Sequence, residues 1–329
     1  MLGDAAQEAM AFTRHAGTST LEQGTLDHLR TVLVDIERSY DREPPAELFR
    51  TAASYRARVD EMIQGRHTLA EGRELYVCAA WLSEQLAWLA WDLGARTAAK
   101  AYALDCWHHA DQAGHDELCG WAMDLMSVIA LYDGRPEEAA LAARKGIARL
   151  PTRHPLVVGL RAKLARAHAR MGDREGCESQ LGRARRAYDR LPSRAPMRFE
   201  ADAGPVALYV MTAYSASASV WLGDYGKARE RAEETLAVHA SLPERDRRPG
   251  REAIARCDLG IALAALGSPA EAVEQGRRAL GSPTAVKSVF SRIGDLDRAL
   301  TSRYPDAPDA RDFHEGYRQA AGRRSLPSA

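Results

Sequence analysis

Apolar residues recur every three or four positions along most of the chain, and no segment alternates apolar with polar residues. The first period is that of an amphipathic helix and the second that of a strand, so the pattern predicts an all-α protein. Outside the central part of the chain, the predicted helices cover residues 20–40, 44–63, 68–88, 284–304 and 309–321. Thr20 and Thr68 are placed to cap the first and third of these, and the Pro44-Pro45 pair to start the second. Residues 322–329 are expected to fray.

A repeated pattern organises the central part of the chain. Five glycines end successive helix-like stretches about 40 to 50 residues apart: Gly94, Gly134, Gly172, Gly223 and Gly267. A small residue follows each glycine by five positions, as Ala99 follows Gly94, and another precedes it by seven, as Ala87 does. Glycine can end a helix with a positive-φ cap, and small residues let two antiparallel helices approach closely. The pattern therefore predicts five consecutive helix hairpins.

These segments, among them LYDGRPEEAALAARKG and WLGDYGKARERAEETL, resemble the tetratricopeptide (TPR) repeat. The resemblance covers residues 80–281, although the family's regular Trp and Tyr are missing and the units exceed the ~34 residues of the type repeat. It implies a right-handed superhelical solenoid of antiparallel helix hairpins. We expect an N-terminal helical subdomain over residues 1–79, the five repeats over 80–281, and capping helices with a tail over 282–329.

Four phrases carry a second likeness: TSTLEQGTLDHLRTVL, ELYVCAAWLSEQLAWLAWDLG, ALYDGRPEEAALAARKGI and SRIGDLDRAL. In this order they resemble the C-terminal sensor half of helix-turn-helix (XRE-type) transcription regulators of high-GC bacteria. Those regulators have a small DNA-binding domain in front, whereas fewer than twenty residues precede the first long predicted helix here. We therefore expect no specific nucleic-acid binding by this chain alone. A sensor part whose reader domain is missing from this sequence is the related alternative.

Composition narrows the classes further. The chain has 45 basic and 45 acidic residues, so it has no overall attraction for nucleic acid or membrane surfaces. No apolar run reaches the ~18 residues of a membrane span, and the first residues do not form a secretory signal. Five scattered cysteines fit reduced thiols better than a disulfide framework. A cytoplasmic, bacterial protein is expected.

Two cysteines and three histidines fall within the stretch CWHHADQAGHDELC, from Cys106 to Cys119. The Cys106–His109 and His115–Cys119 spacings put two ligands on one helix face, which suits Zn²⁺. In the repeat pattern, however, Cys106 holds a position where the other repeats have small residues, and buried cysteine behaves as a small hydrophobe. Packing is therefore the preferred explanation, and no metal or cofactor is expected. A metal-dependent protein or enzyme centred on this stretch remains the alternative.

The chain contains no catalytic motif that we recognise. It lacks G-x-S-x-G, HExxH and C-x-x-C, and no nucleophile, base and orienting group form a recognisable set. No enzymatic activity is therefore expected.

Residues 161–198 have an excess of positive charge, because they contain eleven Lys or Arg against four Asp or Glu. A solvated helix pair would explain this excess, but so would a surface for an acidic partner.

Five of the six tryptophans fall between residues 81 and 121, and Trp81, Trp88 and Trp91 share one helix stripe. The TPR resemblance implies that the first helix of each repeat lines a concave groove. The groove positions counted back from the repeat glycines are Trp81, Glu84, Trp88, Trp91, Asp92, Trp121, Asp124, Tyr132, Arg166, Arg170 and Trp221. Three bare tryptophans would expose on the order of 500 Å². Either a partner or the protein's own N-terminal helices must therefore cover them.

The function that these observations favour is a non-catalytic binding and regulatory module. It would hold a peptide, a protein segment or a small signal molecule in the groove and act in transcription regulation.

Overall fold

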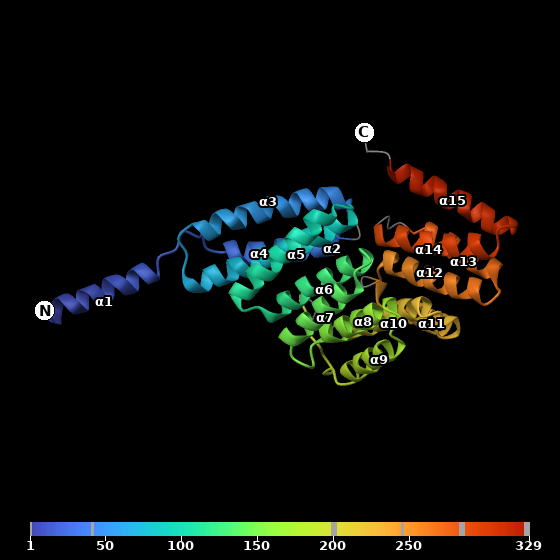
Figure 1. The fold of residues 1–329 in the computed structure, drawn as a ribbon. Helices are drawn as coiled ribbons and strands as arrows, with labels where there is room; N and C mark the ends of the chain where they lie inside the picture. The colour runs from blue at the N-terminus through green and yellow to red at the C-terminus, as the bar shows by residue number, and fades with distance from the viewer. Residues whose placement is uncertain (1, 41–42, 199–202, 245–246, 283–286, 326–329) are drawn as a thin grey trace. The chain divides into compact units, whose positions relative to one another are not determined.

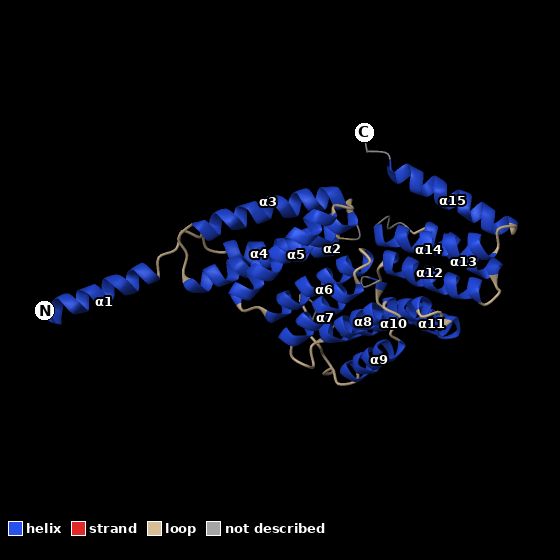
Figure 2. Cartoon of the chain, viewed as in Figure 1, coloured by secondary structure: helices blue, strands red, loops and turns tan. Residues whose placement is uncertain are grey.

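The computed structural model describes residues 2–40, 43–198, 203–244, 247–282 and 287–325. Within these ranges the chain is helical with no strand, as Figure 2 shows, and the all-α prediction is confirmed. None of the described helices combines the length and apolar character needed to cross a membrane.

The chain divides into two compact units, Met1–Leu125 and Met126–Ala329, and the boundary lies inside helix α6 (Figure 1). The first unit contains α1 (Leu2–Ala16), α2 (Thr25–Ser39), α3 (Pro45–Gln64), α4 (Leu69–Asp92), α5 (Arg96–Ala113) and the first part of α6 (Asp116–Tyr132). The second contains the rest of α6 and α7 (Pro136–Arg149), α8 (Pro155–Arg170), α9 (Arg174–Tyr188), α10 (Gly204–Trp221), α11 (Tyr225–Ser241), α12 (Pro249–Ala265), α13 (Pro269–Leu280), α14 (Lys287–Arg303) and α15 (Pro308–Ser325).

The five repeat glycines each separate two helices, as the sequence pattern predicts. All five have positive φ, from 72° at Gly223 to 92° at Gly267. The residue after each glycine donates a backbone hydrogen bond to the carbonyl of the residue five positions before it, as Ala95 does to Ala90. This is the hydrogen bond of a Schellman cap, which needs a left-handed residue at its centre. The glycines therefore end α4, α6, α8, α10 and α12.

The small residues flanking these glycines are buried where paired helices meet. The described set comprises Ala87, Ala99, Ser127, Ala139, Ala165, Cys177, Ala216, Ala228, Gly260 and Ala272. At Gly260 an added Cβ would lie 2.9 Å from a methyl of Leu296 and 3.2 Å from the Ala272 carbonyl oxygen. Side-chain size at these positions therefore limits how closely the helices can approach.

The N-terminal helix boundaries agree with the sequence except at one cap. Thr68 caps α4 in a reciprocal capping box with Glu71, and Pro45 is the first residue of α3. The prediction that Thr20 is an N-cap is wrong, because α2 starts at Thr25 after the left-handed Gly24. Thr20 instead bonds the carbonyl of Arg66 through both its amide and its hydroxyl. The sequence pattern also gave no indication of α1.

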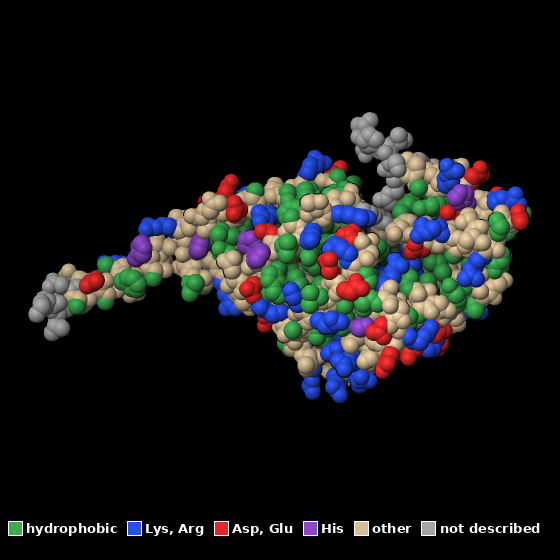
Figure 3. All heavy atoms as spheres, in the orientation of Figure 1, with side chains coloured by type: hydrophobic (Ala, Val, Ile, Leu, Met, Phe, Trp, Pro, Cys, Tyr) green, Lys and Arg blue, Asp and Glu red, His purple; other side chains and the backbone are tan. Residues whose placement is uncertain are grey.

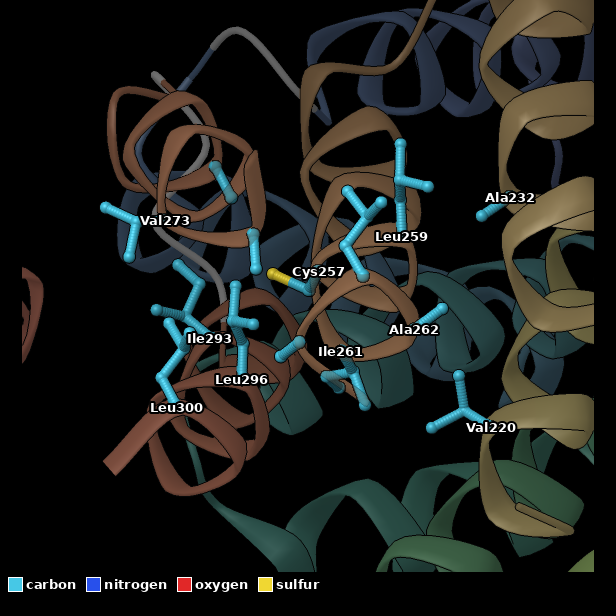
Figure 4. Packing of buried hydrophobic residues seen from close by; sticks show 14 of the residues in the cluster. Val220, Ala232, Cys257, Leu259, Ile261, Ala262, Val273, Ile293, Leu296 and Leu300 are labelled. Carbon is cyan, nitrogen blue, oxygen red and sulfur yellow. The ribbon is translucent and has the colours of Figure 1, made fainter. Parts of the chain in front are cut away.

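The second unit has a core between its C-terminal helices (Figure 4). Cys257 and Leu259 of α12, Val273 of α13, and Ile293 and Leu296 of α14 belong to one buried cluster. Burial raises the pKa of the Cys257 thiol above its ordinary value, so this cysteine is a neutral core residue. Both C-terminal helices that the sequence predicts are present, and α15 extends to Ser325. The predicted fraying tail thus begins inside a helix, and its last four residues lie outside the described ranges.

Candidate functional site

Helix α8 divides the basic run of residues 161–198 between two sides. Successive helical residues are rotated by about 100°. Arg161 therefore lies on the opposite side of α8 from Arg170, with Arg166 and Lys163 near the Arg170 side. Basic side chains that the sequence shows as one charge excess therefore lie on two different sides of α8.

Arginines surround the Trp221 ring at the end of α10. The Cζ atoms of Arg170, Arg166 and Arg292 lie 4.3, 4.7 and 5.6 Å from the ring centroid. Arg166 also lies 4.6 Å from the ring of Tyr214, and Lys163 Nζ lies 5.0 Å from the same ring. We call Lys163, Arg166, Arg170, Tyr214 and Trp221 the Trp221 cluster. Cation–π contacts of this length stabilise a cation that has lost part of its hydration.

Burial distinguishes Arg166 from Arg170. Arg166 is only 4% exposed, and its Nε, among the described residues, has no hydrogen-bond partner. Arg170 is exposed, while Tyr214 and Trp221 are half-buried. Although the residue as a whole is exposed, neighbouring protein atoms remove part of the hydration of the Arg170 guanidinium and lower its pKa from the ordinary value. The charges of Arg292 and Arg166 lower it further, against the attraction of Asp295. The cluster thus combines two buried cations, Lys163 and Arg166, with one exposed cation and partly accessible aromatic faces.

A buried ionic network adjoins the cluster. Asp258 of α12 accepts hydrogen bonds from Arg292 Nε at 2.6 Å and from Arg292 Nη2, and its other oxygen accepts one from Ser217 at 2.8 Å. Arg292 Nη1 donates to Asp295 at 2.8 Å. Burial opposes the charge of Arg292, but Asp258 and Asp295 outweigh it and raise the arginine's pKa. The network connects α10, α12 and α14 through polar groups.

The tryptophan stripe of α4 is largely enclosed in the first unit. Trp81 and Trp91 are buried, and Trp88 is half-buried. Trp88 Nε1 donates to Glu84 at 2.9 Å, and Glu84 is buried as well. The edge of the Trp81 ring system faces His115 at a centroid distance of 6.1 Å.

Helix α2 lies against the side of α4 that includes this stripe. Gln85 donates a hydrogen bond to the Leu33 carbonyl of α2 at 3.0 Å, and Asp92 accepts one from Tyr40 at 2.5 Å. Gln85 and Asp92 are separated by two helical turns and lie beside Trp88 on the same helical face. An N-terminal helix therefore covers part of the stripe, which was one of the two possibilities that the sequence left open.

The remaining predicted groove residues are divided between the units. Trp121 Nε1 donates to Glu117 at 3.3 Å, and Asp124 is buried, both in the first unit. Tyr132 belongs to the second unit, where Arg166 lies 5.8 Å from its ring. Of the eleven predicted residues, the structure gathers four around one point: Tyr132, Arg166, Arg170 and Trp221.

Sequence reasoning missed two members of the Trp221 cluster, Lys163 and Tyr214, and one residue that contacts it, Arg292. Lys163 is one turn before Arg166, and Tyr214 is nine residues before its repeat glycine, a position that the groove count left out. Arg292 comes from α14, outside the five repeats. Of these residues, only Lys163 could have been found from the sequence, because its helical spacing places it on the same side of α8 as Arg166 and Arg170.

The cysteine–histidine stretch has the contacts of packed core residues. Cys106 is fully buried and its thiol points to the Leu118 carbonyl at 3.7 Å. His115 precedes α6 and its Nδ1 accepts the Leu118 amide at 3.3 Å. His109 Nδ1 lies 2.9 Å from the Asp105 carbonyl oxygen. In the part of the chain that the structure describes, no three His, Cys, Asp or Glu side chains are placed to hold a metal ion.

Comparison with known proteins supports the fold. No protein-family model matches the chain, and no curated protein sequence matches it either. Among solved structures, the chain is similar to the crystal structure of BtubC (BKLC) from P. vanneervenii, a helical protein. The TM-score is 0.51 at 14% sequence identity, covering 80% of this chain and 95% of that chain. At this identity the likeness concerns the fold alone.

Proposed function

We propose that this chain is a non-catalytic binding and regulatory module that holds an acidic peptide or protein segment at the Trp221 cluster. In this proposal the five glycine-terminated hairpins form a TPR-like superhelical stack, and the cluster lies on its concave side. The φ values of the glycines and the likeness to BtubC support such an arrangement.

The observation that carries the proposal is the state of Arg166. Its guanidinium is nearly buried against Tyr214 and Trp221, and no carboxylate of the described residues forms an ion pair with it. A buried charge without a charged partner is costly, and cation–π contacts offset only part of that cost. A ligand carboxylate over Arg166 and Arg170 would supply the missing partner, since arginine binds carboxylates through two parallel hydrogen bonds.

A regulatory role follows from which helices contribute. Arg166 and Arg170 lie on α8, Tyr214 and Trp221 on α10, and Arg292 reaches the same ring from α14. A ligand bound there would contact or bias several helices at once, and so shift the population of their arrangements. The resemblance to the sensor half of XRE-type regulators supports a role in transcription, through a partner chain in the cytoplasm. A small anionic signal molecule would use the same residues.

The proposal can be tested with fluorescent ten-residue peptides containing Asp, Glu and one aromatic residue. We expect one or more acidic sequences to bind the full chain, and Arg166→Gln or Arg170→Gln to weaken binding by about 2 kcal/mol, as hot-spot arginines do. Arg185→Gln is the matched control, because it removes the same charge from an exposed position that pairs with Asp189. Equal effects of all three substitutions would show nonspecific attraction and refute the proposal.

A further inference from the structure

A second group of arginines lines a surface pocket on the other side of α8. Five arginines from three consecutive segments converge there: Arg153 before α8, Arg161 in α8, Arg183 and Arg186 in α9, and Arg190 just after α9. Thr152 and Ala187 complete the lining. Figure 3 shows basic side chains gathered at the lower edge of the view, near α9. We call this set the arginine pocket.

The described residues provide no negative charge to balance this pocket. None of the five arginines forms an ion pair with a described carboxylate, and the one hydrogen bond that Arg161 makes is to the neutral Gln180, at 3.4 Å.

Three acidic residues on and near α9 are engaged elsewhere. Asp173 pairs with His168, Glu178 with Lys227, and Asp189 with Arg185. Burial lowers the pKa of Arg161, and the charges of Arg183 and Arg186 lower it further. The pocket is therefore a site of uncompensated positive charge.

We infer that the arginine pocket binds a compact polyphosphate group, meaning two or more adjacent phosphates. Guanidinium groups bind phosphate oxygens bidentately, and five of them match a ligand with several negative charges better than a single carboxylate. The Thr152 hydroxyl adds a neutral donor. Ala187 is the one apolar residue in the lining and no aromatic side chain contributes, so the pocket offers a nucleotide base no aromatic stacking surface.

This site is independent of the proposed peptide-binding function. The arginine pocket and the Trp221 cluster are on opposite sides of α8 and share no residue. A polyphosphate bound to the pocket would bridge the turn before α8 to α9. Such a ligand would relieve the repulsion among the five cations, and hence raise the melting temperature of the protein.

The test is calorimetric titration of the full chain with inorganic triphosphate at moderate ionic strength. We expect saturable binding with one site per chain, and a rise in melting temperature as triphosphate is added. The double substitution Arg183→Gln/Arg186→Gln should weaken binding by about tenfold or more, because it removes two charge-assisted contacts. Both residues are exposed, so the variant should fold, which its circular dichroism checks.

The matched control is Arg185→Gln, which removes the same charge from the same helix outside the pocket. It should change triphosphate affinity by less than about twofold, since salt screens an exposed charge that does not contact the ligand. Equal losses in the control and the double variant would overturn the inference. Arg166→Gln should also leave triphosphate binding unchanged, which separates failure of this site from failure of the Trp221 cluster.

Further ligands identify the recognised group and its source. Adenosine triphosphate with the affinity of triphosphate would assign recognition to the phosphate chain alone, whereas about tenfold tighter binding would assign the nucleotide as the source. Citrate binding as tightly as triphosphate would overturn the inference, because the pocket would then be a general anion surface. Duplex DNA binding more tightly than triphosphate, with loss in the same double variant, would overturn it in favour of a nucleic-acid surface.

Discussion

Substituting Asp258 by alanine tests the buried network that joins α10, α12 and α14. The side chain of Asp258 is 1% exposed and that of Arg292 is 5% exposed, so neither group reaches water. The substitution removes the acceptor of two Arg292 hydrogen bonds and one Ser217 hydrogen bond. Arg292 would remain charged and buried.

The size of the effect follows from what remains. Breaking a buried ion pair by removing one partner costs about 3–5 kcal/mol. Here Arg292 keeps its hydrogen bond to Asp295, and the single hydroxyl proton of Ser217 can turn fully to the Ala213 carbonyl, 3.3 Å away. Both retained contacts reduce the loss, so we expect Asp258→Ala to destabilise the protein by about 3 kcal/mol, at the lower end of that range.

Urea unfolding of the full chain at pH 7, followed by far-ultraviolet circular dichroism, measures this loss. Asp295→Ala is the control, because Asp295 is 28% exposed and its pair with Arg292 should contribute about 1 kcal/mol. The double substitution Asp258→Leu/Arg292→Met replaces the pair with apolar groups and should recover most of the stability. A loss below about 1 kcal/mol for Asp258→Ala, or a double variant no more stable than the single one, would refute the reasoning.

Three further predictions concern single side chains. Cys106→Ala should cost roughly 1 kcal/mol of stability and Cys106→Leu more, because the site is fully buried between paired helices. Thermal melting of both variants measures the two losses, and an unchanged melting temperature for Cys106→Leu would contradict the prediction. Trp88→Phe keeps an aromatic ring but replaces the indole with a smaller phenyl group and removes the donor to buried Glu84. Urea unfolding should show a loss of about 1–3 kcal/mol, whereas an unchanged midpoint would show that the hydrogen bond contributes nothing. Burial lowers the pKa of His239 below its ordinary value of 6.5, so the unfolded chain binds the proton more readily and stability should fall as pH drops below about 6.5. His239→Phe should lose part of this pH dependence. An identical slope of unfolding free energy against pH in both proteins would contradict the assignment.

The hairpins could be predicted from the sequence because their signals are local. Each hairpin depends on a glycine at the helix cap and on small residues five positions after and seven positions before it. These residues are close in sequence, so their spacing can be recognised from the sequence alone. The same argument explains the error at Thr20. Its partner is the Arg66 carbonyl, 46 residues away, and no local pattern indicates such a contact.

The candidate sites could be predicted only in part, for a similar reason. Register in the repeats placed Arg166, Arg170 and Trp221 on one side, and the structure brings them together. Arg292 reaches the same ring from a helix outside the repeats, and no repeat register assigns it. The charge excess was visible as a count, but a count does not distinguish the two sides of α8, whereas the rotation of about 100° per residue does.

The two sides of α8 differ in how their positive charges are stabilised, and this difference predicts which side binds an anion more tightly. In the Trp221 cluster, aromatic faces within 4.3 to 5.8 Å stabilise the guanidinium groups before any ligand binds. In the arginine pocket, no aromatic ring and no described carboxylate does so, and the arginines lower one another's affinity for protons, as at Arg161. An anion bound to the pocket therefore relieves a larger repulsion than one bound to the cluster. Relief of this repulsion contributes to the affinity itself, so triphosphate should bind the pocket more tightly than an acidic peptide of equal charge binds the cluster, and at equal concentration it should raise the melting temperature more.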